Sequence, residues 1–243
     1  MIDPIRFSDY IRSLAPERES LPDEIRREAQ NADVPVIRPE TEALLVFLLK
    51  MRKPLRILEI GAAVGYSAVV MAYACPEAFI DTIENYEKRI PVCLSNLKRA
   101  GVSDRVHLYE GDASEVLKTL TGLYDFIFMD AAKAQYIRWL PDCERLLKPG
   151  GILFTDNVLQ EGDVLEARTV IERRDRTIHK RMREFLYEIT HSEAWESVIL
   201  PVGDGAAVSF KPSSSGFSTP RGRDVSQKLT EKQKMSAQPT DEG

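Results

Sequence analysis

The chain has 243 residues, of which 43% are hydrophobic and 29% charged, and its formal net charge at pH 7 is −5. A chain of this length can bury one sizeable core but is too short for two large domains. The net acidity argues against a protein coated in positive charge for non-specific nucleic-acid binding, and we expect no DNA partner, although a local basic patch would be hidden in the sum.

Cysteine spacing and hydropathy indicate the cellular compartment in which the protein works. Cys75, Cys93 and Cys143 form no Cys-x-x-Cys pair, so neither a disulfide framework nor a thiolate zinc site is indicated. The N-terminal residues are polar and charged, unlike a secretory signal. Uninterrupted apolar runs such as residues 43–49 are far below the ~20 residues that a membrane span needs. We therefore expect a cytoplasmic protein with no membrane partner.

The first part of the chain is a predicted helical appendage. Residues 1–33 are charged with scattered apolar positions, and a Leu-Pro pair at 21–22 separates two predicted short helices. These helices could pack on the main domain or on a partner subunit. Pro35 and Pro39 then frame an extended link into a helix at 41–50, whose apolar side chains are typical of a docking helix.

From Arg56 the hydrophobic pattern alternates between strands and helices, as it does in βαβ units. The predicted strands lie at 56–60, 79–84, 105–109, 124–129, 152–155, 196–200 and 206–210. The predicted helices lie at about 65–75, 86–100, 113–120, 134–147 and 164–192. Because a short turn-rich link joins the last two strands, we expect an α/β fold with a seven-stranded, mostly parallel sheet, an antiparallel last strand and helices on both faces. This main domain spans 34–211, and we expect the polar segment 212–243 to be a disordered tail.

A glycine-rich turn follows the first of these strands. Glu59 lies near the end of the strand, and Gly61 and Gly65 flank three small or apolar residues before Tyr66-Ser67. Glycine removes Cβ where a ligand would approach the backbone, and the start of the next helix offers free N–H groups. A dinucleotide site would require a third glycine. The Glu59 carboxylate suits a cationic or polyhydroxyl ligand better than a pyrophosphate, although a purely structural turn could have the same residues.

Two more acids lie at the ends of the next two strands: Glu84 closes the strand at 79–84, and Asp112 comes after the strand at 105–109. Together with the glycine turn they resemble class I S-adenosylmethionine-dependent methyltransferases, which have a Rossmann-like fold. The resemblance implies S-adenosyl-L-methionine as the cofactor, with Glu84 on the ribose hydroxyls and Asp112-Ala113 facing the adenine. The residues that the resemblance places at the cofactor are Glu59, Gly61, Gly65, Tyr66, Ser67, Glu84, Asp112, Ala113 and Asp130.

Oxygen-bearing side chains follow two later strands. Asp130 comes after the strand at 124–129, and Asp156-Asn157 come after the strand at 152–155. Open α/β sheets bind ligands at the carboxyl ends of their strands. Two carboxylates and an amide, with no histidine nearby, suit Mg²⁺, with Mn²⁺ or Ca²⁺ as alternatives and zinc disfavoured. Each acid alone could simply be a helix N-cap, but the two together favour a metal site.

These residues, with Lys133, resemble the metal-dependent O-methyltransferases that include catechol and caffeoyl-CoA methyltransferases. The resemblance implies that Asp130, Asp156 and Asn157 bind the metal and that Lys133 is the general base, which makes Lys133 and Asp130 the predicted catalytic residues. The chemistry agrees, because a divalent cation lowers the pKa of a bound hydroxyl and a nearby amine can accept its proton. A lysine at the start of a helix is also commonly a solvated surface residue.

A basic segment lies beyond the second metal motif, with seven cations against two acids between 168 and 183. Such a helix could contact RNA phosphates, or it could be only a solvated face. This segment, the run at 155–162 and the Ile-Leu-Pro-Val-Gly-Asp-Gly run at 199–205 resemble bacterial tRNA 5-hydroxyuridine methyltransferases over roughly 5–211. The cations that the resemblance assigns to RNA binding are Arg168, Arg173, Arg174, Arg176, Lys180 and Arg181.

That resemblance implies methylation of the 5-hydroxyl of 5-hydroxyuridine at the tRNA wobble position, which gives 5-methoxyuridine. The 5-hydroxyl and the adjacent carbonyl oxygen would form a bidentate pair much like a catechol. The alternative is a catechol- or caffeoyl-CoA-type O-methyltransferase acting on a small molecule. A non-enzymatic scaffold is disfavoured because the complete set of predicted metal and base residues is present. We also expect a homodimer and a contact with the anticodon region of tRNA.

Overall fold

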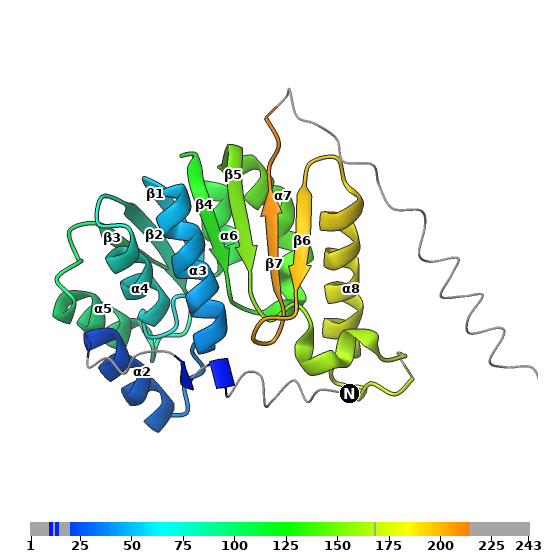
Figure 1. The fold of residues 1–243 in the computed structure, drawn as a ribbon, viewed down its shortest axis with the longest axis horizontal. Coiled ribbons are helices and arrows are strands. Elements are labelled where there is room, and N and C mark those ends of the chain that lie inside the picture. The colour runs from blue at the N-terminus through cyan, green and yellow to red at the C-terminus, as the bar shows by residue number, and fades with distance from the viewer. Residues whose placement is uncertain (1–9, 12, 15–19, 168, 214–243) are drawn as a thin grey trace, which may run out of the picture. The chain divides into compact units, whose positions relative to one another are not determined.

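The computed structural model describes residues 10, 11, 13, 14, 20–167 and 169–213. A seven-stranded sheet lies at its centre, with the strand order β3-β2-β1-β4-β5-β7-β6 (Figure 1). The strands are β1 (Arg56–Ile60), β2 (Phe79–Glu84), β3 (Val106–Glu110), β4 (Tyr124–Met129), β5 (Leu147–Thr155), β6 (Glu196–Leu200) and β7 (Ala206–Phe210). Strands β1 to β5 are parallel, and β7 is antiparallel to both β5 and β6. The predicted sheet is confirmed.

Helices cover both faces of the sheet (Figure 1). They are α2 (Leu21–Asn31), α3 (Pro39–Arg52), α4 (Tyr66–Ala74), α5 (Ile90–Arg99), α6 (Ala113–Thr119), α7 (Tyr136–Leu146) and α8 (Arg176–His191), with short 3₁₀ helices η1 (Lys133–Gln135) and η2 (Gln160–Leu165). Along β4, Phe126 and Phe128 join the core under α2 to α5, whereas Ile127 and Met129 join the core under α6 to α8. This alternation follows from the two-residue period of a strand, which sends successive side chains to opposite faces.

Helix α2 differs from the expectation at its start. The Leu-Pro pair at 21–22 was expected to separate two helices, but α2 begins at Leu21 with Pro22 inside its first turn. Proline fits there because the first N–H groups of a helix have no partner within the helix. Ile25 and Ala29 are buried in the core that α2 shares with α4. Most of the first predicted helix lies outside the described residues.

The basic segment is shorter as a helix than expected. A helix over 164–192 was predicted, but η2 is followed by turns, and α8 begins only at Arg176. Leu165 at the end of η2 and Val170 in the turn region are 84% and 69% exposed, although Val164 and Ile171 are buried. Within α8, buried side chains at helical spacing run from His179 through Met182 and Phe185 to Ile189. Because packing of an apolar face provides most helical stability in proteins, the regular helix forms where that buried face is continuous.

Two other expectations concern the end of the chain and its hydropathy. The predicted disordered tail at 212–243 lies outside the described residues from 214 onward. Within the described part of the chain, no helix is long and apolar enough to cross a membrane.

Candidate active site

Two adjoining cavities lie at the carboxyl ends of the parallel strands. Cavity I has a volume of about 310 Å³, and its lining includes Glu84, Asp112, Ala113 and Trp139. Cavity II has a volume of about 450 Å³, and its lining includes Arg38, Tyr66, Ser67, Lys133, Asp156 and Asn157. The residues that line both are Gly61, Ala63, Arg89, Asp130 and Ala131. A ligand in cavity I would therefore meet a ligand in cavity II at the Gly61–Asp130 boundary.

The glycine turn forms this boundary by bringing two strand ends together. Gly61 has a φ of +105°, and a Cβ on it would lie 2.2 Å from the backbone oxygen of Asp130. Gly65 has a φ of +79°, and a Cβ there would lie 2.9 Å from the Cys93 sulfur. Only glycine readily adopts such a positive φ and also has no Cβ to collide with these neighbours. The spacing of the two glycines thus serves close packing of the turn against β4 and α5.

Glu84 holds the turn from the cavity I side. One carboxylate oxygen accepts a hydrogen bond from the Ala63 N–H at 2.7 Å, and the other accepts from the N–H groups of Asn85 and Tyr86 at 3.0 and 2.8 Å. Asp112 caps α6 by accepting from the Ser114 N–H at 2.7 Å. The structure therefore brings the predicted residues Glu84, Asp112 and Ala113 together around one cavity.

Glu59 lies beneath the turn instead of in a cavity. It is fully buried, and it is not among the described residues that line cavity I or cavity II. Burial raises the pKa of Glu59 to about 7, and the polar neighbours Ser67 and Thr82 oppose the rise. The Thr82 hydroxyl lies 2.5 Å from Glu59 Oε2, and Glu59 Oε1 has no hydrogen-bond partner among the described residues. The predicted direct contact of Glu59 with a ligand stays a prediction.

The predicted metal and base residues gather in cavity II, with Asp130, Lys133, Asp156 and Asn157 all in its lining. Burial and the charges of Asp156 and Glu59 raise the pKa of Asp130 to about 7. Burial, followed by the charge of Asp204, raises the pKa of Asp156 to about 6, against hydrogen bonds from Asn157 and Thr41. The negative charges of these two carboxylates repel each other, and a cation bound between them would relieve that repulsion.

The donor set of cavity II fits a hard divalent cation. Among the described residues, no cluster of three or more His, Cys, Asp and Glu side chains is arranged to hold a metal. The set in cavity II is instead two carboxylates and the amide oxygen of Asn157, which suits Mg²⁺. Asn157 has a φ of 58°, a left-handed conformation that asparagine tolerates better than most residues. The residues present therefore fit the predicted metal.

Asp204 is a cavity residue that the sequence reasoning missed. It is 7% exposed and lines cavity II, and its Oδ2 lies 3.6 Å from Lys133 Nζ. The backbone oxygen of Asp204 also accepts a hydrogen bond from the Leu159 N–H at 3.0 Å. The only signal in the sequence was the Val-Gly-Asp-Gly run, which we interpreted as a link between the last two strands. An acid between two glycines at the carboxyl edge of a sheet could have been added to the site.

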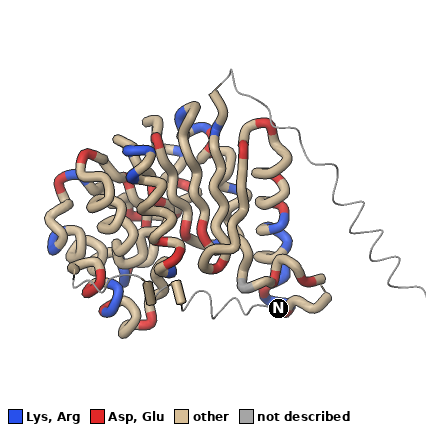
Figure 2. Tube along the Cα trace, in the orientation of Figure 1, with Lys and Arg blue, Asp and Glu red and all other residues tan. Residues whose placement is uncertain are grey.

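The basic segment does not gather around either cavity. Arg174 pairs with Glu172 and Asp175, and Lys180 with Glu184. Arg176 and Arg181 donate to the backbone oxygens of Ile171 and Ala134. Arg173 is exposed, and Arg168 lies outside the described residues. Figure 2 shows acidic positions beside basic ones along this part of the chain. Most of the cations predicted to bind RNA thus have partners within the chain.

Comparisons with known proteins bear on this arrangement. A profile of the O-methyltransferase family matches residues 13–211. Caffeoyl-CoA O-methyltransferase of Medicago sativa is 34% identical over 179 residues, which cover 68% of this chain and 70% of that protein. Catechol O-methyltransferase of Niastella koreensis is 33% identical over 135 residues, which cover 54% of this chain and 61% of that protein.

The fold is also similar to solved structures of O-methyltransferases. A Staphylococcus aureus protein described as a candidate caffeoyl-CoA O-methyltransferase is 31% identical, with a TM-score of 0.79 over 84% of this chain and 98% of that one. An O-methyltransferase from Bacillus cereus, in complex with SAH, is 25% identical, with a TM-score of 0.75 over 85% of this chain and 97% of that one.

Proposed function

The chain belongs to the O-methyltransferase family, and from this premise we propose that it transfers the methyl group of S-adenosylmethionine to one oxygen of a catechol-type pair on a small molecule. The observation that carries the proposal is the junction of the two cavities at Gly61 and Asp130. Cavity I offers carboxylates and backbone suited to an adenosine, and cavity II offers oxygen donors and an amine suited to the chemistry of a phenolic hydroxyl.

Cavity I would hold the methyl donor. Glu84 would accept hydrogen bonds from the ribose hydroxyls while keeping its bonds to the backbone of the glycine turn. Asp112 and Ala113 would lie along the adenine, next to the indole of Trp139. Gly61 would let the reactive end of the donor pass close to the backbone and reach cavity II.

Cavity II would hold the acceptor. The side-chain oxygens of Asp130, Asp156 and Asn157 would hold a divalent cation. When bound, that cation supplies positive charge that holds the two acceptor oxygens and lowers the pKa of the hydroxyl. Lys133 Nζ would accept the hydroxyl proton. The acceptor oxygen would then form a bond to the methyl carbon as the carbon–sulfur bond breaks, and S-adenosylhomocysteine would leave with the bonding pair.

The test is methyl transfer from labelled S-adenosylmethionine to 3,4-dihydroxycinnamic acid and to its coenzyme A thioester, in the presence of Mg²⁺. We expect a monomethylated product and S-adenosylhomocysteine in equal amounts, with the product lost on chelation and restored by Mg²⁺. No methylation of either acceptor by a protein that binds S-adenosylhomocysteine would overturn the small-molecule acceptor.

The tRNA acceptor predicted from the sequence is the second candidate. The observation in its favour is the excess of cations between 168 and 183. Against it stand the intramolecular partners of Arg174, Arg176, Lys180 and Arg181. The Medicago sativa and Niastella koreensis relatives are named for caffeoyl-CoA and catechol. The same assay with tRNA that carries 5-hydroxyuridine separates the two, because tRNA methylation should fall steeply with rising salt and catechol methylation should not.

The predicted homodimer also stays a prediction. Static light scattering would test it, and a mass near the 27.5 kDa of one chain would contradict it.

A further inference from the structure

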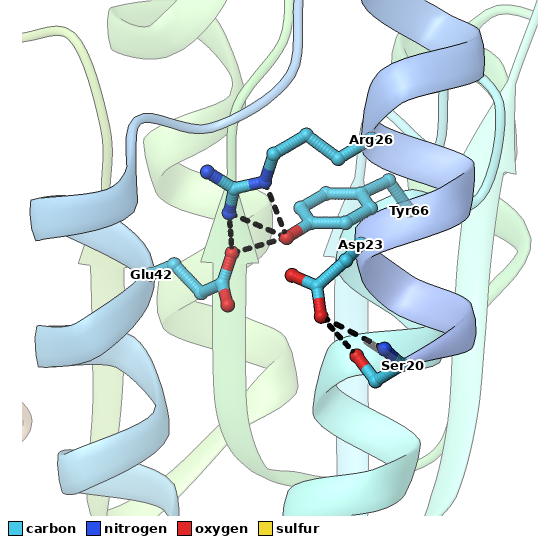
Figure 3. A network of polar contacts seen from close by, with 5 residues as sticks. All are labelled: Ser20, Asp23, Arg26, Glu42 and Tyr66. Atoms are coloured by element: carbon cyan, nitrogen blue, oxygen red, sulfur yellow. Dashed lines mark hydrogen bonds and ion pairs between the residues drawn. The ribbon is translucent and has the colours of Figure 1, made fainter. Parts of the chain in front are cut away.

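Three side chains from three helices meet beside cavity II (Figure 3). Arg26 of α2 donates from Nε to the Tyr66 hydroxyl at 2.9 Å, and its guanidinium pairs with Glu42 of α3. The Tyr66 hydroxyl at the start of α4 donates to the same Glu42 carboxylate. The Arg26 guanidinium carbon also lies 5.0 Å from the centre of the Tyr66 ring. The network therefore ties α2, α3 and α4 together at one point.

This network is largely shielded from water. The Arg26 and Glu42 side chains are 16% and 25% exposed, and Tyr66 is 2% exposed. Burial and the charge of Glu42 raise the pKa of Tyr66, so the hydroxyl keeps its proton and remains a donor. Hydrogen bonds to charged groups are stronger than neutral ones, and removal of one partner leaves the other charge poorly solvated. The network should therefore hold Tyr66 firmly.

Tyr66 lies where the glycine turn, helix α4 and cavity II meet. It is the first residue of α4, it follows Gly65 directly, and both Tyr66 and Ser67 line cavity II. Because the reactive end of a donor in cavity I would reach cavity II past Gly61, that end would meet the start of α4. On its α5 side the turn is held by the Asn96 amide, which donates to the Val64 oxygen at 2.9 Å. On the α2 side it is held through Tyr66. The Arg26–Glu42 pair therefore fixes the direction in which α4 leaves the glycine turn, and with it the free N–H groups at the start of the helix.

We propose that Arg26 and Glu42 are positioning residues for the methyl donor and act through Tyr66, which makes α2 a working part of the cofactor site. Neither residue is among the described residues that line cavity I or cavity II. They would hold the turn in the conformation that binds the donor. Their loss should therefore weaken donor affinity more than it lowers kcat. This inference rests on the proposed use of S-adenosylmethionine.

The test compares two residues of α2 that both attach this helix to the rest of the protein. Arg26→Met removes the guanidinium from the network and keeps the aliphatic part of the side chain. Glu28→Gln is the matched control, because Glu28 attaches α2 to α5 through Arg99, away from the Tyr66 hydroxyl, and leaves the Arg99–Asn96 hydrogen bond in place. Calorimetry with S-adenosylhomocysteine measures Kd without any acceptor. Methyl-transfer kinetics then give the KM for the donor and kcat separately.

We expect Arg26→Met to raise both the Kd for S-adenosylhomocysteine and the KM for the donor about tenfold, with kcat changed less than threefold. Glu28→Gln should leave the Kd within twofold of the wild-type value, and Arg26→Lys should restore part of the lost affinity. Equal affinity of Arg26→Met and wild type would overturn the inference, as would an equal loss of affinity in Glu28→Gln.

A second variant keeps the test decisive if Arg26→Met fails to fold. Tyr66→Phe deletes a single oxygen and should raise the Kd in the same direction, and an unchanged Kd would overturn the inference. If the wild-type chain itself binds no S-adenosylhomocysteine, the proposed function fails instead. The two failures are thereby distinguished.

Discussion

The Glu84 carboxylate gives the sharpest prediction about the cofactor site. Glu84→Gln keeps the size of the side chain but replaces one acceptor oxygen with an amide that only donates. If the remaining oxygen keeps the Asn85 and Tyr86 N–H groups, the new amide faces the Ala63 N–H, donor against donor. Ala63 has a φ of 46°, so the turn loses its hydrogen bond at a residue that already has an unfavourable conformation.

The magnitude follows from the type of bond lost. A hydrogen bond to a charged group contributes about 1.5–3 kcal/mol, so the free energy of unfolding should fall by about 2 kcal/mol. Because the same turn separates the two cavities, affinity for S-adenosylhomocysteine should fall about tenfold or more. Urea denaturation and calorimetry measure the two effects. Glu87→Gln, at an exposed position three residues later, is the matched control and should stay within about 0.5 kcal/mol of wild type.

Two results together would contradict a role for Glu84 in holding the turn. If Glu84→Gln unfolds at the wild-type urea concentration and also binds S-adenosylhomocysteine as tightly, the carboxylate does not hold the turn. A loss of affinity with unchanged stability would show that Glu84 meets the ligand but contributes little to the loop.

Three further predictions concern other residues of the site. The raised pKa of Glu59, about 7 in the folded protein against an ordinary 4.5, means that its contribution to stability is present below about pH 4.5 and is lost as the pH rises through 7. Between pH 4.5 and pH 8, the free energy of unfolding of Glu59→Gln should therefore fall by roughly 3 kcal/mol less than that of wild type, as measured by urea denaturation at each pH. Parallel pH profiles of the two proteins would contradict this. Gly61→Ala should lower the free energy of unfolding by more than about 2 kcal/mol, because its Cβ would meet the Asp130 backbone oxygen, and near-normal stability in urea denaturation would refute the close approach. Lys133→Ala should lower kcat by about two orders of magnitude or more and leave S-adenosylhomocysteine affinity unchanged, whereas near-normal turnover would remove Lys133 as the base.

Much of the fold could be predicted because local signals and tertiary packing agree. The strand at 56–60 ends at glycine, and its β-branched and apolar run is buried on both faces of a parallel sheet, so pattern and structure coincide. The strand predicted at 152–155 in fact begins at Leu147, through a Lys-Pro-Gly-Gly run that looked like a turn. Pairing of Leu147 with Tyr124, followed by an irregularity in register, carries the strand through those residues, and no local pattern reveals such a pairing.

The site residues that directly follow parallel strands could be predicted from the sequence, whereas residues from other elements could not. Asp130, Asp156 and Asn157 meet in cavity II because the carboxyl ends of adjacent parallel strands share one edge of a sheet. Glu59 follows the same rule in sequence yet faces the interior, since side chains alternate along a strand and it lies two residues before the turn. Asp204 and Arg26 approach from a hairpin and a preceding helix. Their contacts depend on three-dimensional docking that the spacing of residues does not reveal.

The antiparallel finish of the sheet has a consequence for how the protein is completed during synthesis. The described residues that line cavity I all lie between Ile60 and Trp139 in the sequence. Cavity II needs Asp204, whose hairpin attaches to the chain after β5 by hydrogen bonds from the Val158 and Leu159 N–H groups. The residues that would recognise the donor are therefore synthesised before the C-terminal hairpin, and the half that would hold the acceptor is completed last. A lineage could therefore change its acceptor by altering this late hairpin and leave the donor half as it is.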